Sequence, residues 1–290
     1  MMSVKRLVKE AAYSILCFVV YALSRLPMVV LYSLASFVFL FTYHIGYRKD
    51  VVIQNIARSF PEKRYGEIQA IAKKFYSCFT AYFAEILKSI SAPTAVLIEK
   101  IEFENLELIN KHINANRNII ACLGHCGNWE MLNVLPYKLP HPVYAVFKPL
   151  KSDFMNRLMT TVRARFGLLL IPVASVVRHM LSAKSQPGIY LFLADQSPSL
   201  KEESYRLSFL NQKTYFFSGM EKLARKGDTA VIYFHITQPS KGHYKVVCIP
   251  ICSRAESTID GEITEKYAAL LTENIQEEPY GWLWTHKRWK

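Results

Sequence analysis

The hydrophobic pattern divides the chain into an apolar N-terminal stretch and a longer region in which apolar and polar positions alternate in short runs. Residues 11–23 carry no charged side chain, and a second run of twenty residues without Asp, Glu, Lys or Arg extends from Met28 to Tyr47. A helix of about 20 apolar residues spans the roughly 30 Å hydrocarbon core of a bilayer. We therefore predict an N-terminal membrane anchor over residues 1–47, as one helix or as a hairpin. A buried core helix is the alternative for residues 11–23.

Basic residues flank the second apolar run on both sides but are denser after it. Those that follow it are Arg48, Lys49, Arg58, Lys63, Arg64, Lys73 and Lys74. Loops rich in Lys and Arg stay on the cytoplasmic side of a membrane. We therefore expect the main domain, residues 48–290, to face the cytoplasm from a bacterial inner membrane.

The remaining pattern predicts one α/β domain. Residues 48–90 are expected to be helical, because large apolar side chains recur there at spacings of three and four. From about residue 101, short apolar runs typical of strands are separated by segments of helical length. The predicted strands are 118–123, 143–147, 189–194, 230–236 and 244–251, and the predicted helices are 153–166, 176–183, 218–226 and 262–278. This alternation predicts a mixed, mostly parallel sheet flanked by helices.

Composition narrows the class of partner. The chain has 36 Lys and Arg against 23 Asp and Glu, a formal charge of +13, 13% aromatic residues and a mean hydropathy of +0.09. These values exclude a disordered chain, which would be poor in apolar residues, and a transporter with many spans, which would be far more hydrophobic. The positive charge favours an anionic partner, which at this point is nucleic acid, an acidic protein or an anionic membrane surface.

The most informative segment is Gly124-His125-Cys126-Gly127-Asn128-Trp129-Glu130, which follows an apolar strand. A histidine at the carboxyl end of such a strand lies where open α/β sheets bind their ligands. An imidazole held by Glu130 can take a proton from a hydroxyl, because the carboxylate fixes its tautomer and stabilises the imidazolium that forms. No G-x-S-x-G nucleophile accompanies the pair. Direct attack of an alcohol on an activated acyl group is therefore favoured over a covalent acyl-enzyme.

The same segment suggests two other chemistries. Cys126 is either a nucleophile or, as we expect, a small buried residue. The pair Cys122-x3-Cys126 beside His125 suggests zinc, but a second Cys/His pair at tight spacing is missing, so no metal site and no cofactor are predicted.

The motif from Gly124 to Glu130 resembles the H-x4-D/E motif of the lysophospholipid acyltransferase superfamily, in the form found in the late acyltransferases of bacterial lipid A biosynthesis. Other blocks resemble this family in order and spacing: Asn55–Glu62, Arg163-x3-Gly167, Val177-Arg178-x-Met180-Leu181, Asp195-Gln196 and Pro279–Lys290. The resemblance covers nearly the whole chain and implies a fold like that of glycerolipid acyltransferases. It also implies transfer of a fatty acyl chain from an acyl carrier protein or coenzyme A thioester to a hydroxyl of a lipid A precursor.

The resemblance assigns roles to particular residues. It makes His125 the general base and Glu130 its catalytic partner. It assigns substrate binding to Asn128, Lys148, Arg163, Arg178, Asp195 and Gln196. Asp195 follows the predicted strand 189–194, so we expect it to enter the pocket from a neighbouring strand. Arg163 and Arg178 are either phosphate ligands or ordinary surface charges of helices.

Two departures from the family leave the acceptor open. Lys148 stands where the family has an arginine, which keeps the charge but loses bidentate phosphate geometry. The chain has Phe209-Leu210-Asn211 where the family is richer in glycine. A lysophospholipid, an aminolipid or a lipid pigment is therefore the alternative acceptor of the same chemistry.

The last predictions concern the C-terminal segment and functions other than catalysis. Three tryptophans, Trp282, Trp284 and Trp289, alternate with basic residues and are predicted to form an interfacial belt on anionic headgroups. A nucleic-acid-binding module is disfavoured because no recognition helix, zinc finger or RNA-binding aromatic motif is found. A catalytically dead scaffold is disfavoured because His125 and Glu130 are both present.

Overall fold

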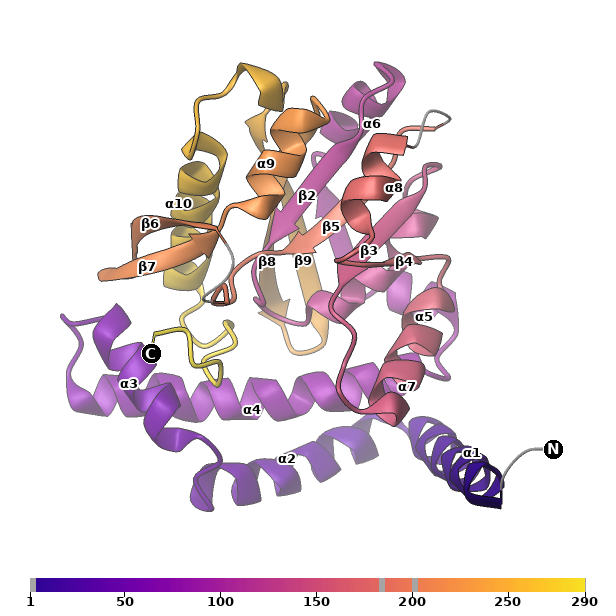
Figure 1. Ribbon diagram of the computed structural model, residues 1–290. Helices are drawn as coiled ribbons and strands as arrows, with labels where there is room; N and C mark the ends of the chain where they lie inside the picture. Colours follow the sequence, from indigo (N-terminus) through magenta and orange to yellow (C-terminus); the bar gives the residue numbers. More distant parts are fainter. Residues whose placement is uncertain (1–3, 183–185, 200–202, 290) are drawn as a thin grey trace.

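The computed structural model describes residues 4–182, 186–199 and 203–289 (Figure 1). Its centre is a seven-stranded sheet in the order β1-β9-β8-β2-β5-β3-β4. Five neighbouring strands, β8, β2, β5, β3 and β4, run parallel, whereas β9 is antiparallel to β8 and β1 follows the direction of β9. The strands are β1 (Ile101–Glu104), β2 (Ile119–Leu123), β3 (Val143–Phe147), β4 (Leu169–Pro172), β5 (Ile189–Leu193), β8 (Ala230–Ser240) and β9 (His243–Cys252). The prediction of a mostly parallel α/β sheet is confirmed.

A separate antiparallel hairpin and ten α-helices complete the described chain. The hairpin consists of β6 (Ser204–Phe209) and β7 (Gln212–Phe217). The helices before the sheet are α1 (Val4–Ser24), α2 (Met28–His44), α3 (Lys49–Ser59), α4 (Tyr65–Ser89) and α5 (Thr94–Ile98). The later ones are α6 (Glu107–Asn114), α7 (Asp153–Ala164), α8 (Val176–Ser182), α9 (Gly219–Lys226) and α10 (Glu262–Glu277), with 3-10 helices η1 (Trp129–Tyr137) and η2 (Ala255–Ser257).

The sheet separates two apolar cores. All five residues of β2 are buried, and successive side chains point to opposite faces, as the pleat of a strand requires. Ile120 and Cys122 join the core that α8, α9 and α10 cover, whereas Ile119, Ala121 and Leu123 join the core beneath α5, α6 and η1. The central strand is therefore covered on both faces, which explains why its sequence is a continuous apolar run.

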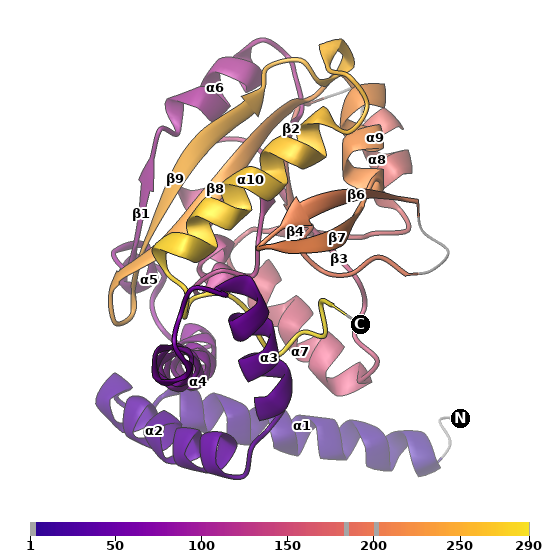
Figure 2. The ribbon, with the colours of Figure 1, turned by 90° about the vertical axis from the view of Figure 1, so that its left-hand side faces the viewer.

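The N-terminal helices lie outside these layers. Figures 1 and 2 show α2 running beside α4, with α1 continuing past the end of α4 toward α7. The axes of residues Lys9–Ser24 of α1 and of α2 differ in direction by 112°, with the bend around Pro27. In the described chain, no single helix has the length and apolarity of a membrane span, although this bent pair has them together. The membrane anchor and the division at residue 47 stay predictions.

Most predicted elements are present in the structure. The differences are a break in one helical region, small shifts at the ends of elements and several short strands that were not predicted. The region 48–90, predicted to be helical, contains α3 and α4, with a break at Pro61, which cannot donate a backbone hydrogen bond. The predicted strand 189–194 and helix 153–166 correspond to β5 and α7 with shifts of one or two residues at their ends. Residue 183, the end of another predicted helix, lies outside the described residues. The strands β1, β4, β6 and β7 were not predicted.

Candidate active site

His125 lies in the loop that leaves the carboxyl end of β2. Two glycines flank it, and Gly127 takes a φ of +55°, a left-handed conformation that glycine adopts without strain. A Cβ atom at Gly127 would lie 3.2 Å from Ile236 Cγ2, so space as well as conformation favours glycine there. The loop therefore turns sharply and leaves the His125 side chain 14% exposed at the end of the sheet.

Asp195 is the carboxylate that contacts the His125 ring. It follows β5, the parallel neighbour of β2, and its Oδ1 atom lies 2.6 Å from His125 Nδ1. Its other oxygen, Oδ2, accepts hydrogen bonds from the His125 backbone N–H at 2.9 Å and from Trp282 Nε1 at 2.7 Å. With Nδ1 donating to Asp195, the imidazole leaves Nε2 as the atom that can accept a proton.

These contacts keep Asp195 charged although its side chain is only 2% exposed. Burial alone would raise its pKa, but the His125 charge and the hydrogen bonds from His125 and Trp282 outweigh burial and lower the pKa to about 2. Asp195 is therefore an ionised, acceptor-only group at neutral pH, suited to orient an imidazole and to stabilise an imidazolium.

The C-terminal segment closes the back of this loop. Trp282 forms a β-bridge with Cys126, the Gly127 N–H donates to the Gly281 carbonyl at 2.9 Å, and the Leu283 N–H donates to the His125 carbonyl at 3.1 Å. The predicted interfacial belt is wrong for this segment. Trp282 and Trp284 are 2% and 0% exposed because they pack in the core. The last residue of that prediction, Lys290, lies outside the described residues.

Glu130 does not contact His125, which corrects the predicted pairing of these two side chains. Glu130 receives two hydrogen bonds from Arg163 of α7, at 3.0 Å from Nε and 2.5 Å from Nη2, and a third from Asn133 at 3.3 Å. Positions three apart share a face of a 3-10 helix, so Glu130 and Asn133 of η1 both face α7. The Trp129 ring packs edge-on against the His125 ring, with centroids 4.7 Å apart. A catalytic role of Glu130 stays a prediction.

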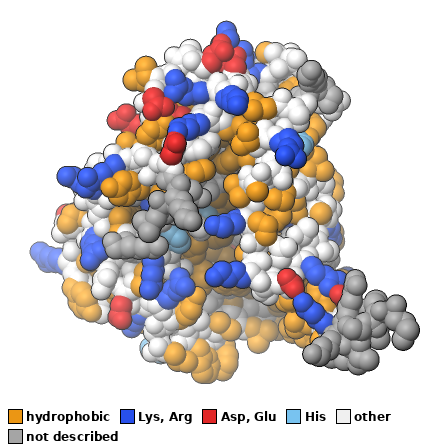
Figure 3. Space-filling view, viewed as in Figure 1, with side chains coloured by type: hydrophobic (Ala, Val, Ile, Leu, Met, Phe, Trp, Pro, Cys, Tyr) orange, Lys and Arg blue, Asp and Glu red, His pale blue; other side chains and the backbone are white. Residues whose placement is uncertain are grey.

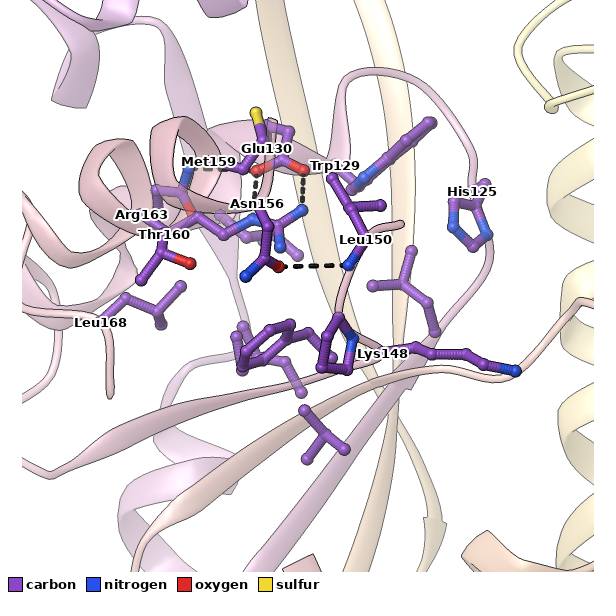
Figure 4. A pocket seen from close by; sticks show the side chains of 18 of the residues that line it. His125, Trp129, Glu130, Lys148, Leu150, Asn156, Met159, Thr160, Arg163 and Leu168 are labelled. Atoms are coloured by element: carbon purple, nitrogen blue, oxygen red, sulfur yellow. Dashed lines mark hydrogen bonds and ion pairs between the residues drawn. The ribbon is translucent and has the colours of Figure 1, made fainter. Parts of the chain in front are cut away.

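A pocket of about 470 Å³ opens in front of His125. Figure 4 shows His125 on one side and the Glu130–Arg163 pair on the other, with Lys148, the residue after β3, below His125 in this view. Much of the lining is apolar, and includes Leu132, Ala145, Val146, Phe147, Leu150, Met159, Leu168, Leu191 and Leu193. The view of this face in Figure 3 is hollowed near its centre, with basic side chains around the hollow. The pocket thus combines an apolar lining with cationic groups.

The other predicted binding residues differ in position. Gln196 lines the pocket, with its Nε2 atom 3.5 Å from His125 Nε2. Asp195 is behind His125 rather than in the lining, and Asn128 is 3% exposed and donates to Glu85 of α4 at 2.9 Å. Arg178 lies on the exposed side of α8 and is not part of the pocket lining. The structure therefore brings together Lys148, Arg163 and Gln196, but not Asn128, Asp195 or Arg178, as residues able to touch a substrate in this pocket.

The surroundings of Cys126 disfavour a nucleophilic role. Cys126 is buried, and burial raises the pKa of its thiol well above the ordinary value, which disfavours a thiolate nucleophile. Among residues 4–182, 186–199 and 203–289, no group of three or more His, Cys, Asp or Glu side chains could hold a metal ion.

The positions of two residues of the site were not predicted from the sequence. Trp282 was interpreted as a surface residue, since an aromatic residue near lysines gives no signal of burial. Glu85 was overlooked, although a lone acid within the apolar face of helix 65–89 is a signal. The Glu85 carboxylate is 6% exposed and also accepts hydrogen bonds from Tyr32 at 2.9 Å and Tyr244 at 2.6 Å. It ties α4 to α2, to β9 and to the loop after His125.

The fold and the site define an open α/β protein with a histidine–carboxylate pair at the strand ends, an arrangement suited to removing a proton from a bound hydroxyl. The model of the bacterial lipid A biosynthesis acyltransferase family matches residues 3–290. The chain therefore belongs to this family and is an acyltransferase, which confirms the prediction made from its motifs.

Other comparisons add little to the family match. No curated protein matches the chain in sequence. A solved structure, the 1-acyl-sn-glycerophosphate acyltransferase PlsC from Thermotoga maritima, is 14% identical, with 90% of this chain and 97% of that chain covered and a TM-score of 0.37. That similarity is too low to assign an acceptor or the positions of active-site residues.

Proposed function

We propose that this acyltransferase moves a fatty acyl chain from a thioester donor to a hydroxyl of a lipid A precursor, with His125 as the general base. The observation that carries the proposal is the position of His125, whose Nδ1 atom is bound by a buried carboxylate while its ring lines the pocket. A base fixed in this way can deprotonate the acceptor hydroxyl for direct attack on the thioester.

The reaction proceeds by direct attack. His125 Nε2 takes the proton of the acceptor hydroxyl while the hydroxyl oxygen forms its bond to the thioester carbonyl carbon. Asp195 stabilises the imidazolium through Nδ1, and the amide of Gln196, beside Nε2, is a donor for the negative charge on the carbonyl oxygen. The tetrahedral intermediate collapses by breaking the carbon–sulfur bond, and the imidazolium returns the proton to the departing thiolate.

The pocket lining suggests how the substrates bind. The apolar side chains of β3, β5 and α7 suit the acyl chain, whose burial contributes about 0.8 kcal/mol per methylene. Lys148 and Lys151, exposed where the pocket opens, suit a phosphate group of the acceptor. Arg163 is less suited to that role, because Glu130 occupies two of its donors.

We further propose that the protein works on the cytoplasmic surface of a bacterial inner membrane and takes acyl carrier protein or coenzyme A thioesters. Support comes from α1 and α2, where apolar side chains are exposed on both helices. They include Ile15, Phe18, Val29, Leu34, Phe37, Leu40 and Phe41. Soluble proteins rarely expose so continuous an apolar surface. An acidic carrier protein and the coenzyme A phosphates suit the positive charge equally.

The experiment that tests the proposal is acyl transfer by the purified chain, read by mass spectrometry of the lipid product. A lipid A precursor, a lysophospholipid and an aminolipid are offered separately, each with acyl carrier protein and with coenzyme A thioesters. The proposal predicts one added acyl chain on the lipid A precursor and loss of that product with His125→Ala. Acylation of the lysophospholipid or the aminolipid alone would overturn the acceptor, and full activity of a folded His125→Ala variant would overturn the mechanism.

A further inference from the structure

Trp282 binds the same carboxylate that orients His125. Asp195 Oδ1 faces the imidazole, whereas Oδ2 lies between two donors, the His125 backbone N–H and the Trp282 indole N–H. Besides the His125 ring, the Trp282 indole is a side chain that donates a hydrogen bond to Asp195. Both of the other donors belong to His125, so without the indole the carboxylate would be held only by the residue that it has to orient. The indole N–H is a donor from a separate segment and restricts rotation of the carboxylate about its side-chain bonds.

The Trp282 indole is itself held firmly. Its backbone forms the β-bridge with Cys126, in the loop that carries His125. Its ring packs edge-on against Trp284, with centroids 4.8 Å apart, and against Phe209 at 5.9 Å. An indole held on both its backbone and its ring side presents its N–H at a fixed position to Asp195.

We propose that Trp282 is a positioning residue for catalysis: its N–H locks the Asp195 carboxylate in the rotamer that holds His125 with Nε2 facing the substrate. The residue acts through Asp195 and touches no substrate. Removing the N–H lets the carboxylate and then the imidazole sample other orientations, so the productive arrangement is populated less often. The cost falls on kcat, since the walls that bind the substrates are unchanged.

Trp284 is a matched control within the same segment. It is also a fully buried tryptophan of the C-terminal segment, and its N–H donates at 2.6 Å, but to the backbone carbonyl of Pro279 rather than to Asp195. Trp282→Phe and Trp284→Phe each remove an indole N–H and part of a ring from the same core. A difference between them reports the contact with Asp195.

The kinetic test compares the two variants in the acyl-transfer assay, and in this readout the inference rests on the proposed function. We expect kcat of Trp282→Phe to fall about tenfold or more with KM changed less than about twofold. Trp284→Phe keeps the indole N–H at position 282 and loosens only one ring contact to it, so its kcat is expected to fall clearly less. Equal losses in the two variants, or none in either, would overturn the inference.

Two additions keep the test decisive. If Trp282→Phe does not fold, replacing the indole by benzothienylalanine keeps the size of the ring but has sulfur in place of N–H. The same kcat loss is then expected at position 282 and not at 284. The second addition is the low-field proton resonance of the His125–Asp195 hydrogen bond, measured by NMR on the whole chain without substrate.

The resonance separates the inference about Trp282 from the proposed acyltransferase function. We expect the position 282 replacement to shift or broaden it and the position 284 replacement to leave it unchanged. An unchanged resonance in the Trp282 variants would overturn the inference even if the chain is active. A wild-type chain without acyl transfer would instead contradict the proposed function, while the resonance would still test the contact between Trp282 and Asp195.

Discussion

The two sides of His125 are built differently. Behind the ring, Asp195 and Trp282 are buried, hydrogen-bonded and tied to the C-terminal segment. In front, the pocket is lined by a carboxylate that is already paired, Glu130 with Arg163, and by the exposed Lys148. The two acids near one histidine thus have different contacts: Asp195 binds the His125 ring from behind, and Glu130 pairs with Arg163 in a wall of the pocket. Proximity in the motif does not decide which carboxylate is the partner.

The largest effect is expected from replacing His125, which lies between the two sides. We expect His125→Ala to lower kcat by about 10³-fold, since a positioned general base contributes roughly 10²–10⁴. The measurement is steady-state acyl transfer, with the melting temperature as the test of folding. His243→Ala, at an exposed histidine of β9 outside the pocket, is the matched control and is expected to keep wild-type activity.

The next largest effect is expected from replacing Asp195, which lies behind the His125 ring. We expect Asp195→Asn to lower kcat by about 10²-fold, because an amide holds the wrong imidazole tautomer or none. Glu130→Gln keeps the shape of the other acid and is expected to lose less than about tenfold. Single-turnover rates measure both changes at the chemical step. A larger loss in Glu130→Gln than in Asp195→Asn would reverse the roles assigned to the two carboxylates.

Acid should weaken the back of the site in a defined range of pH. The folded-state pKa of Asp195, about 2, lies below its ordinary value of 3.8, so its contribution to the free energy of unfolding is complete above pH 3.8. That contribution, about 2 kcal/mol, is lost as the pH falls from about 4 to about 2. Urea unfolding at several pH values measures it. In Asp195→Asn this part of the pH dependence should disappear, and an unchanged profile would contradict the assignment.

The pair on the pocket wall should matter for stability more than for chemistry. Glu130→Ala leaves the half-buried Arg163 without its partner, so we expect the free energy of unfolding to fall by about 1–2 kcal/mol. The double variant Glu130→Leu with Arg163→Leu removes both charges and should recover most of that loss. Urea unfolding measures both. A double variant less stable than either single one would show that the pair does more than neutralise its own charges.

The smallest effect is expected at the opening of the pocket. Lys148→Ala should raise the KM for a phosphorylated acceptor about fivefold and leave kcat nearly unchanged, because an exposed lysine contributes about 1 kcal/mol to binding a phosphate. Lys226→Ala, on α9 and outside the pocket lining, is the control. A change in kcat at Lys148 instead would place its ammonium group near the reacting atoms.

The same two sides of His125 show what could be predicted from the sequence. The apolar runs that become β2, β3 and β5 were predicted nearly to the residue, because parallel strands covered on both faces are continuous apolar segments. β2 and β5 are buried along nearly their whole length, and β3 is mostly half-buried. His125 and Asp195 were both assigned to the strand ends for that reason. Their contact was not predicted, because strand order and side-chain direction depend on tertiary packing.

The remaining differences have similar causes. Glu130 lies five residues from His125, but the 3-10 geometry of η1 and the guanidinium of Arg163 turn it toward α7. Trp282 is buried by contacts with segments far away in the sequence, which aromatic content near lysines does not reveal. Local pattern therefore located the elements and placed His125 at a strand end, whereas long-range packing determined which side chains contact His125.

The central claim is that Asp195, rather than Glu130, holds His125. The most direct measurement is the low-field proton resonance of the His125 Nδ1–H in the whole chain labelled with ¹⁵N-histidine. We predict that this resonance is present in the wild type and in Glu130→Gln and absent in Asp195→Asn. A resonance that persists in Asp195→Asn and disappears in Glu130→Gln would contradict the account.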